Sequence, residues 1–214
     1  MRITYTDHRY HIINSNIYTM AVGTELIKEL RDRTGVSVME CKKALEETEG
    51  DIDKALVVLR KKSGDSAAKK SDRTLGAGTV AAYIHSSKDV GAMVALSCET
   101  DFVAKNPEFP ELAYSIAMHA AATNPQFITK EEVTEDDLKA AREVFEKEAA
   151  DKPDAVREKV VQGKIDSYLE EKVLMEQSFI KDPEHKIKSL IEQASQKFGE
   201  RVVITQCVRF STRA

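Results

Sequence analysis

The rest of the chain is organised around the stretch Cys98-Glu99-Thr100-Asp101-Phe102-Val103-Ala104-Lys105-Asn106. The apolar run of residues 91–98, which ends where this stretch begins, has the composition of a buried strand. Pro107 cannot continue a sheet ladder, and the residues after it follow a helical pattern. The stretch is therefore predicted to be a short loop between a strand and a helix.

This loop carries an acid beside an aromatic residue, Asp101 next to Phe102. Because loops lie on the surface, we expect the Phe102 ring to be at least partly exposed. A bulky ring on a short turn fills a pocket either in its own core or in a partner. The spacing of the residues alone does not separate these two uses.

Composition and charge exclude several classes of protein. Charged residues make up 32% of the 214 residues and nearly balance, with a formal net charge of −4. Binding to a phosphate backbone needs a clustered basic surface, so we expect no direct nucleic-acid partner. No apolar run approaches the roughly 20 residues of a membrane-spanning helix, so we expect no membrane association.

The three cysteines, Cys41, Cys98 and Cys207, are widely spaced and form no C-x-x-C pair. An odd number of separated cysteines argues against a disulfide framework. The sequence therefore predicts a reducing, cytoplasmic location.

Residues 1–22 differ in character from the rest of the chain and are predicted to be an unstructured or non-native leader. We interpret Met20 as the natural initiator. An N-terminal peptide beginning at Met1, detected by mass spectrometry, would contradict this interpretation. His8 and His11 could hold a metal ion, but no third ligand stands nearby, so no metal site is expected.

Residues 23–62 predict a module of three short helices. Apolar residues recur at helical spacing in three stripes, Gly35 suits a left-handed stop, and Ser37 with Glu40 forms a capping box. The pattern resembles the ubiquitin-associated fold. Residues 63–76 are polar, small and charge-dense, which predicts a solvated linker, with helical character around Ala67 left open. Its lysines could alternatively contact an acidic partner.

Residues 77–214 predict an α+β core domain. Two alternating runs around the turn of residues 86–89 form a hairpin, and residues 201–210 supply a third antiparallel strand. Helical patterns fill the middle, two of them between Pro153 and Glu176 with a break at Gly163. No G-x-x-x-x-G-K-[ST] motif is present, so a nucleotide hydrolase is a poor candidate.

Three separated motifs resemble those of elongation factor Ts, the nucleotide-exchange factor of the GTPase elongation factor Tu: residues 29–35, 41–45 and 100–106. Weaker support comes from residues 116–119 and 177–179. The chain departs from the family at Val38, where many relatives have methionine, and it has room for only one of the two sheet subdomains of longer members.

The resemblance implies a guanine-nucleotide exchange factor that binds elongation factor Tu with GDP, displaces Mg²⁺ and promotes GDP release. Asp101 and Phe102, flanked by Thr100 and Val103, would approach the magnesium-binding region of the partner, with the Phe102 ring wedged between elements of its nucleotide domain. No covalent chemistry, catalytic residue or cofactor is implied.

Further partner contacts are implied for Lys28 and Arg31 on the first helix, for Met39 on the second, and for His85 at the end of the first strand. The alternatives are a solvated charged face for Lys28 and Arg31, a core position for Met39, and burial or simple exposure for His85. His119 is expected to have a packing role.

Two other classes of function can be weighed against the residues: an adaptor protein and an enzyme. The N-terminal module could belong to a ubiquitin-like or nascent-chain adaptor, although this leaves the match at residues 100–105 unexplained. An enzyme finds no support in metal spacing, nucleophile–base pattern or phosphate loop.

A homodimer is predicted from the alternation of the last strand. Val202, Ile204, Val208 and Phe210 fall on one side, expected to pack under helices. The other side would present Val203, Thr205 and Cys207, with Tyr83 and Met93 nearby, and meet a second copy. Cys207 would then lie near its symmetry mate; the alternative is a monomer with Cys207 buried.

Overall fold

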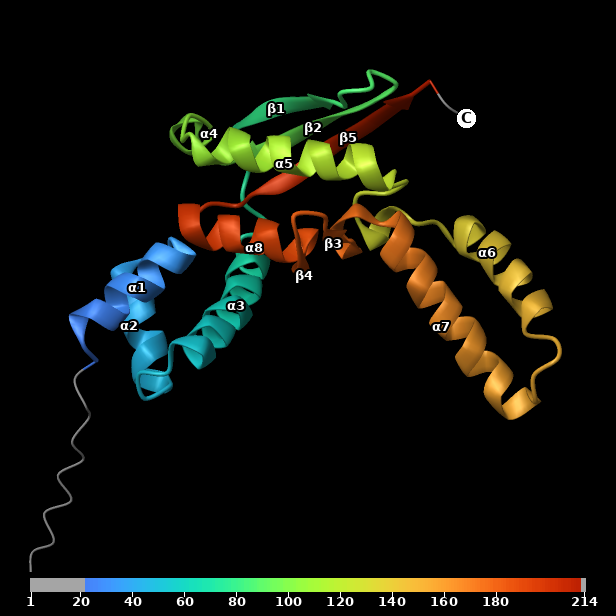
Figure 1. Ribbon diagram of the computed structural model, residues 1–214, viewed down its shortest axis with the longest axis horizontal. Coiled ribbons are helices and arrows are strands. Elements are labelled where there is room, and N and C mark those ends of the chain that lie inside the picture. Colours follow the sequence, from blue (N-terminus) through green and yellow to red (C-terminus); the bar gives the residue numbers. More distant parts are fainter. Residues whose placement is uncertain (1–21, 213–214) are drawn as a thin grey trace, which may run out of the picture.

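The computed structural model describes residues 22–212 of the chain (Figure 1). The predictions for Met20 and for the His8 and His11 pair fall outside these residues. The fold is α+β, as predicted: N-terminal helices precede a three-stranded antiparallel sheet covered by helices. The elements in chain order are α1 (Thr24–Thr34), α2 (Val38–Glu47), α3 (Ile52–Ala68), β1 (Ala77–Ile84), β2 (Val90–Cys98), α4 (Asp101–Ala104), α5 (Glu108–Thr123), η1 (Lys130–Glu132), α6 (Glu135–Glu148), α7 (Asp154–Lys172), η2 (Leu174–Glu176), β3 (Ser178–Phe179), β4 (Asp182–Lys186), α8 (Ile187–Phe198) and β5 (Val203–Ser211).

The helices α1, α2 and α3 bury their apolar stripes against one another and share a hydrophobic core of their own. Gly35 ends α1 in the left-handed region, with φ of 66°, which glycine adopts without a steric penalty. Ser37 begins α2, and its hydroxyl accepts the Glu40 amide at 3.3 Å. The helix boundaries read from Gly35 and Ser37 are therefore confirmed.

Over the first half of residues 63–76 the helical character considered around Ala67 is confirmed, whereas the expectation that this segment is solvated is wrong. α3 continues to Ala68 and packs against α8. Ser63 is buried, and Lys70 is only 8% exposed because its Nζ donates to the Ser195 carbonyl at 2.7 Å. Burial also lowers the pKa of Lys70. Small residues that suggested a linker instead allow close approach of two helices, which composition alone does not reveal.

A second contact fixes the N-terminal module on the core. Lys197 of α8 lies over Gly35, where an added Cβ would come within 2.7 Å of the lysine Cε. The Lys197 ammonium also pairs with Glu108 at the start of α5. The module is therefore held against α8 rather than tethered; whether residues 23–62 and 77–214 are separable domains stays a prediction.

The sheet has the order β1-β2-β5, with both pairs antiparallel. α5 runs along one face of it, with α8 beyond (Figure 1). The main core lies between this face and the two helices. It is formed by Val94, Leu96, Cys98, Phe109, Ala113, Ile116, Ala117, Leu174, Ile187, Ile191, Ala194 and Ile204, among others.

A β-bulge reverses the facing of the last strand. Leu96 pairs with Ile204, but Ala95 pairs with Gln206, so Thr205 has no partner in the register. The Thr205 hydroxyl instead donates to the Ala95 carbonyl at 3.3 Å. Residues beyond the bulge therefore point to the opposite side from the one that simple alternation predicts.

The predicted facing of β5 is consequently wrong after Thr205. Val208 and Phe210 are exposed on the outer face, whereas Cys207 lies half-buried against the core on the helix side. Burial raises the pKa of the Cys207 thiol to about 11, so it remains protonated at neutral pH. Tyr83 also packs on the helix side. Cys207 is thus not placed to meet a symmetry mate across the outer face.

The helices α6 and α7 form an antiparallel arm that extends away from the sheet (Figure 1). The arm has a small core of its own around Ala149, Val161 and Ile165. α7 is continuous through Gly163, so the predicted break there is wrong: packing against α6 outweighs the modest helix penalty of one glycine. None of the helices within residues 22–212 combines the length with the apolar character that a membrane span requires.

His119 is completely buried in α5, in agreement with the packing role predicted for it. Its Nδ1 accepts the Ile180 amide at 3.3 Å, which leaves Nε2 to donate to Gln177 Oε1 at 2.8 Å. Thr123 donates to the same oxygen at 2.8 Å. The neutral imidazole therefore has both nitrogens satisfied, and it ties α5 to the segment that follows α7.

We expect this buried histidine to make stability fall in mild acid. Burial lowers the pKa of His119 in the folded state below its ordinary value of 6.5, while the unfolded chain protonates at that ordinary value. As pH falls below 6.5 the unfolded state binds more protons, so the free energy of unfolding decreases. Urea midpoints measured from neutral pH to about pH 5 should fall less steeply in His119→Gln than in the wild type, and His85→Gln, at an exposed site, should match the wild type. Identical pH slopes for His119→Gln and the wild type would contradict the prediction.

Candidate partner-binding site

The stretch after β2 forms a tight turn with a one-turn helix. β2 ends at Cys98, α4 spans Asp101–Ala104, and Pro107 directly precedes α5. The Thr100 carbonyl accepts the Ala104 amide at 3.2 Å, and the Asp101 carbonyl accepts the Lys105 amide at 3.0 Å. The loop predicted here is therefore more ordered than expected, and its helical turn points consecutive side chains to different sides.

Phe102 and Val103 show this difference in side-chain direction. The Phe102 side chain is 83% exposed, the highest exposure among the large hydrophobic residues of the described chain. Val103, by contrast, is buried in the main core. Because helical neighbours point about 100° apart, Val103 anchors the turn while Phe102 is exposed to solvent. The partner contact of Val103 stays a prediction, and its side chain is buried in the chain on its own.

Asp101 is exposed and forms an ion pair with Lys105 one helical turn later, at 2.6 Å. The hydrogen bond and charge of Lys105 lower the pKa of the Asp101 carboxyl, which is therefore ionised at neutral pH. The turn thus carries an exposed aromatic ring, Phe102, beside the ionised Asp101 carboxylate, which Lys105 holds in place. Such a surface suits insertion of the ring into an apolar pocket next to a cation-binding region.

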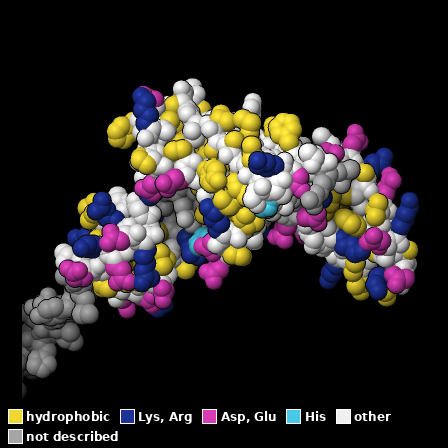
Figure 2. Space-filling model, turned by 45° about the horizontal axis from the view of Figure 1, so that its top comes forward, with side chains coloured by type: hydrophobic (Ala, Val, Ile, Leu, Met, Phe, Trp, Pro, Cys, Tyr) yellow, Lys and Arg dark blue, Asp and Glu magenta, His cyan; other side chains and the backbone are white. Residues whose placement is uncertain are grey.

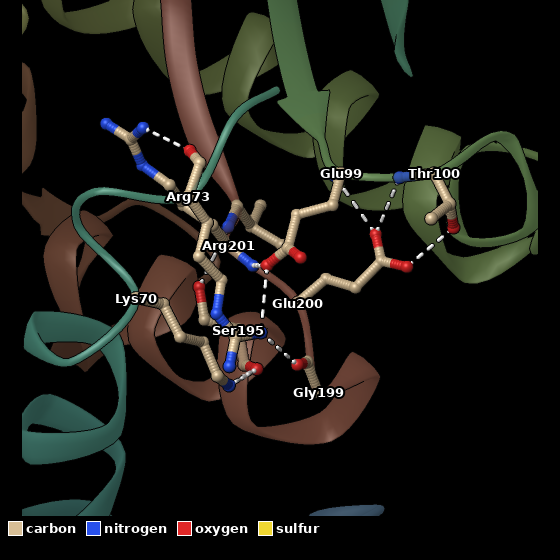
Figure 3. Close-up of polar contacts among 9 residues, drawn as sticks. Lys70, Arg73, Glu99, Thr100, Ser195, Gly199, Glu200 and Arg201 are labelled. Carbon is tan, nitrogen blue, oxygen red and sulfur yellow. Dashed lines mark hydrogen bonds and ion pairs between the residues drawn. The ribbon is translucent and has the colours of Figure 1, made fainter. Parts of the chain in front are cut away.

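The base of the turn is held by a polar network drawn in Figure 3. The Glu200 carboxylate accepts hydrogen bonds from the backbone amides of Glu99 and Thr100. The Glu99 carboxylate in turn accepts from the Arg201 amide and from Arg73. Sequence reasoning missed these residues, because nothing in the local pattern links residues 199–201 to residues 99–100.

Comparison with known proteins gives the family. A sequence model described as Elongation factor TS matches residues 20–213. The chain belongs to the elongation factor Ts family. Its relatives include elongation factor Ts of Thermosipho melanesiensis, 44% identical over 192 residues, which are 89% of this chain and 98% of the relative. Elongation factor Ts of Thermodesulfovibrio yellowstonii is 45% identical over 192 residues, 89% of this chain and 96% of the relative.

The other residues expected from the elongation factor Ts resemblance are all at the surface. Lys28, Arg31 and Met39 are exposed on the N-terminal module, so Met39 is not a core residue. His85 is exposed and its Nδ1 shares a hydrogen bond with the Tyr83 hydroxyl at 3.0 Å. Their contact with a partner remains a prediction.

The structure brings Thr100, Asp101 and Phe102 together and keeps His85 apart from them. Ala77 pairs with Cys98, next to the turn, whereas Ile84 pairs with Gly91 at the other end of the hairpin. An eight-residue strand is about 24 Å long, so His85 lies about that far from the turn. The predicted contacts of this elongation factor Ts chain are therefore spread along an extended surface.

No group of three or more His, Cys, Asp or Glu side chains able to hold a metal ion occurs among residues 22–212.

Proposed function

We propose that the chain is a guanine-nucleotide exchange factor that binds elongation factor Tu with GDP, displaces Mg²⁺ and promotes GDP release in the cytoplasm during translation elongation. Membership of the elongation factor Ts family supports the partner. The three cysteines, all free, suit a reducing compartment.

Exchange of this kind needs binding energy but no covalent chemistry and no cofactor. GDP is held by contacts to its phosphates and by Mg²⁺, which neutralises them. An exchange factor that binds best to the distorted, magnesium-free GTPase lowers the affinity of the GTPase for nucleotide. By linkage, bound nucleotide lowers the affinity of the GTPase for the exchange factor by the same factor.

The exposed Phe102 ring is the observation that carries the proposal. Leaving a phenylalanine in water forgoes about 1.5–3 kcal/mol that burial in a partner would recover. Its neighbour Val103 is fixed in the core and Lys105 pairs with Asp101, so the ring stands on backbone that is already ordered. Little entropy is then lost when it enters a pocket.

Stopped-flow release of a fluorescent GDP from elongation factor Tu, with and without this protein, tests the proposal. We expect faster release that increases with protein concentration and then saturates. Release that is unchanged at saturating concentration would rule out an exchange factor and would favour the adaptor alternative.

The role of Asp101 is tested through magnesium. We expect Asp101→Ala to weaken exchange at millimolar free Mg²⁺, and to weaken it less after chelation, because the ion that the carboxylate helps to displace is then already gone. Asp136→Ala, which removes an exposed acid on the arm, is the matched control. An equal loss of exchange rate with and without chelator would show that Asp101 does not act through magnesium displacement.

The N-terminal module supplies a second contact with the same partner in this proposal. Lys28, Arg31 and Met39 are exposed, and the packing of α3 on α8 holds the module against the core. Two contacts on one rigid body would then act together.

We also propose that the protein is a homodimer, formed through the outer face of the sheet instead of through Cys207. Large apolar side chains on that face are about half exposed or more: Val80, Ile84, Met93, Val208 and Phe210. Hydrophobic side chains gather over this part of the molecule in Figure 2. An uncharged sheet face of this kind can pack on its own copy about a two-fold axis.

We expect Val208→Glu to convert the dimer to a monomer, because a two-fold interface would bury the new carboxylate twice. Light scattering at micromolar concentration under reducing conditions should show the mass of two chains for the wild type and of one chain for the variant. Val57→Glu, at an exposed valine on α3, should remain dimeric. A monomeric wild type would defeat the proposal.

A further inference from the structure

The Glu200 side chain closes onto the base of the turn that carries Phe102 (Figure 3). Its Oε2 accepts the amides of Glu99 and Thr100, each at 3.0 Å, and its Oε1 accepts the Thr100 hydroxyl at 2.5 Å. One carboxylate thus satisfies three donors on two consecutive residues. Hydrogen bonds to an ionised acceptor are about twice as strong as those between neutral groups.

The chain reaches this arrangement through the end of α8. Gly199 stops the helix in the left-handed region, with φ of 73°, and the chain then turns back toward β5. Glu200 comes directly after this reversal, partly buried and directed at residues 99 and 100. Thr100 is the residue before α4, and its side chain makes no capping hydrogen bond to the helix; its hydroxyl donates to Glu200 instead.

Glu99 holds the same turn from the other side. Its carboxylate accepts the Arg201 amide at 2.6 Å and Arg73 Nη1 at 3.2 Å. The Arg201 amide, followed by Arg73, lowers the pKa of the Glu99 carboxyl, so the group is ionised at neutral pH. Arg201 Nη1 also donates to the Arg73 carbonyl at 2.7 Å. The α3–β1 connection, the turn and the start of β5 are therefore joined.

Phe102 does not fix its own position, because its ring has almost no contact with the core. The backbone that carries it is anchored on the C-terminal side by buried Val103 and on the N-terminal side by the three hydrogen bonds to Glu200. We propose that Glu200 is a positioning residue for nucleotide exchange: without touching the partner, it holds Thr100 so that Phe102 is presented in the wedging geometry. This role rests on the proposed function of the chain.

The test is a double-mutant cycle in the GDP-release assay. Glu200→Ala should lower the exchange rate constant by roughly tenfold, since displacing a positioned group by about 1 Å can cost up to about 100-fold. In a Phe102→Ala background, Glu200→Ala should cause no further loss, because the two residues act through the same ring. A general loss of folded protein would instead lower the rate in both backgrounds.

Nuclear magnetic resonance supplies a readout that is independent of activity. Glu200→Gln keeps the side-chain volume but loses acceptor capacity, and it should shift the Glu99 and Thr100 amide resonances and speed their hydrogen exchange. Glu184→Gln, an exposed acid in β4, is the control and should leave both unchanged.

The outcomes distinguish the positioning role from the exchange function itself. A wild type that does not accelerate GDP release overturns the proposed function, and the positioning role with it. An active wild type matched by Glu200→Ala, or losses that add in the double variant, overturns only the positioning role.

Discussion

Phe102→Ala is expected to lower kcat/KM for GDP release by roughly ten- to hundredfold while the protein stays folded. The ring is exposed and contributes little to the hydrophobic core, so its loss removes binding area without creating a cavity. In this proposal the ring contributes to binding only in the complex, where it would be buried. Stopped-flow release and thermal unfolding, measured on the same preparation, separate these two effects.

The control for Phe102 is another exposed apolar residue placed away from the turn. Val144 on α6 is about half exposed, and Val144→Ala should leave both exchange and melting temperature unchanged. A melting temperature that collapses in Phe102→Ala would identify Phe102 as a core residue and reject the wedge.

Phe109→Ala is expected to have the opposite effect. Phe109 lies one helix further along the chain, is 0% exposed, and packs edge-on against Phe198 with ring centroids 5.9 Å apart. Truncating a fully buried phenylalanine typically costs about 3–5 kcal/mol, through lost burial and the cavity that remains. Urea unfolding should show this loss in the free energy of unfolding.

Exchange should survive in the folded fraction of Phe109→Ala, because this residue does not face the partner. Measured at low temperature and corrected for unfolded chain, its rate should be within a few-fold of the wild type. A specific loss of exchange in a fully folded variant would mean that Phe109 has a functional contact and that the division between the two phenylalanines is wrong.

The local features of the fold could be predicted from the sequence. Gly35 and Ser37 mark helix boundaries through backbone conformation and capping, both of which depend only on near neighbours. The same holds for the exposure of Phe102, which follows from its place between a strand and Pro107. The three motifs of the resemblance likewise named the family that the comparisons show.

The features that could not be predicted depend on distant contacts. Apolar residues recur at positions 202, 204, 208 and 210, with only Gln206 interrupting them. Pairing with β2 shows that a bulge lies at this interruption and turns Cys207 inward. Ser63 and Gly64 are residue types typical of a linker, and only the packing of α3 on α8 shows that they lie at a helix–helix contact. Val103 differs from Phe102 only in the side of a one-turn helix that it occupies. Glu200 has no local signal at all, since its three donors lie in another part of the chain.

The pairing of β2 with β5 has a consequence for how the protein is made. β5 is the last element, yet it supplies one of the two neighbours of the central strand, with Leu96 opposite Ile204. The helices α1, α2 and α3 share a core of local contacts, so we expect the N-terminal module to fold as it leaves the ribosome. The sheet cannot close until the C-terminal residues have emerged. Until then one edge of β2 stays unpaired, and chains that terminate before Val203 should expose it and aggregate or bind chaperones.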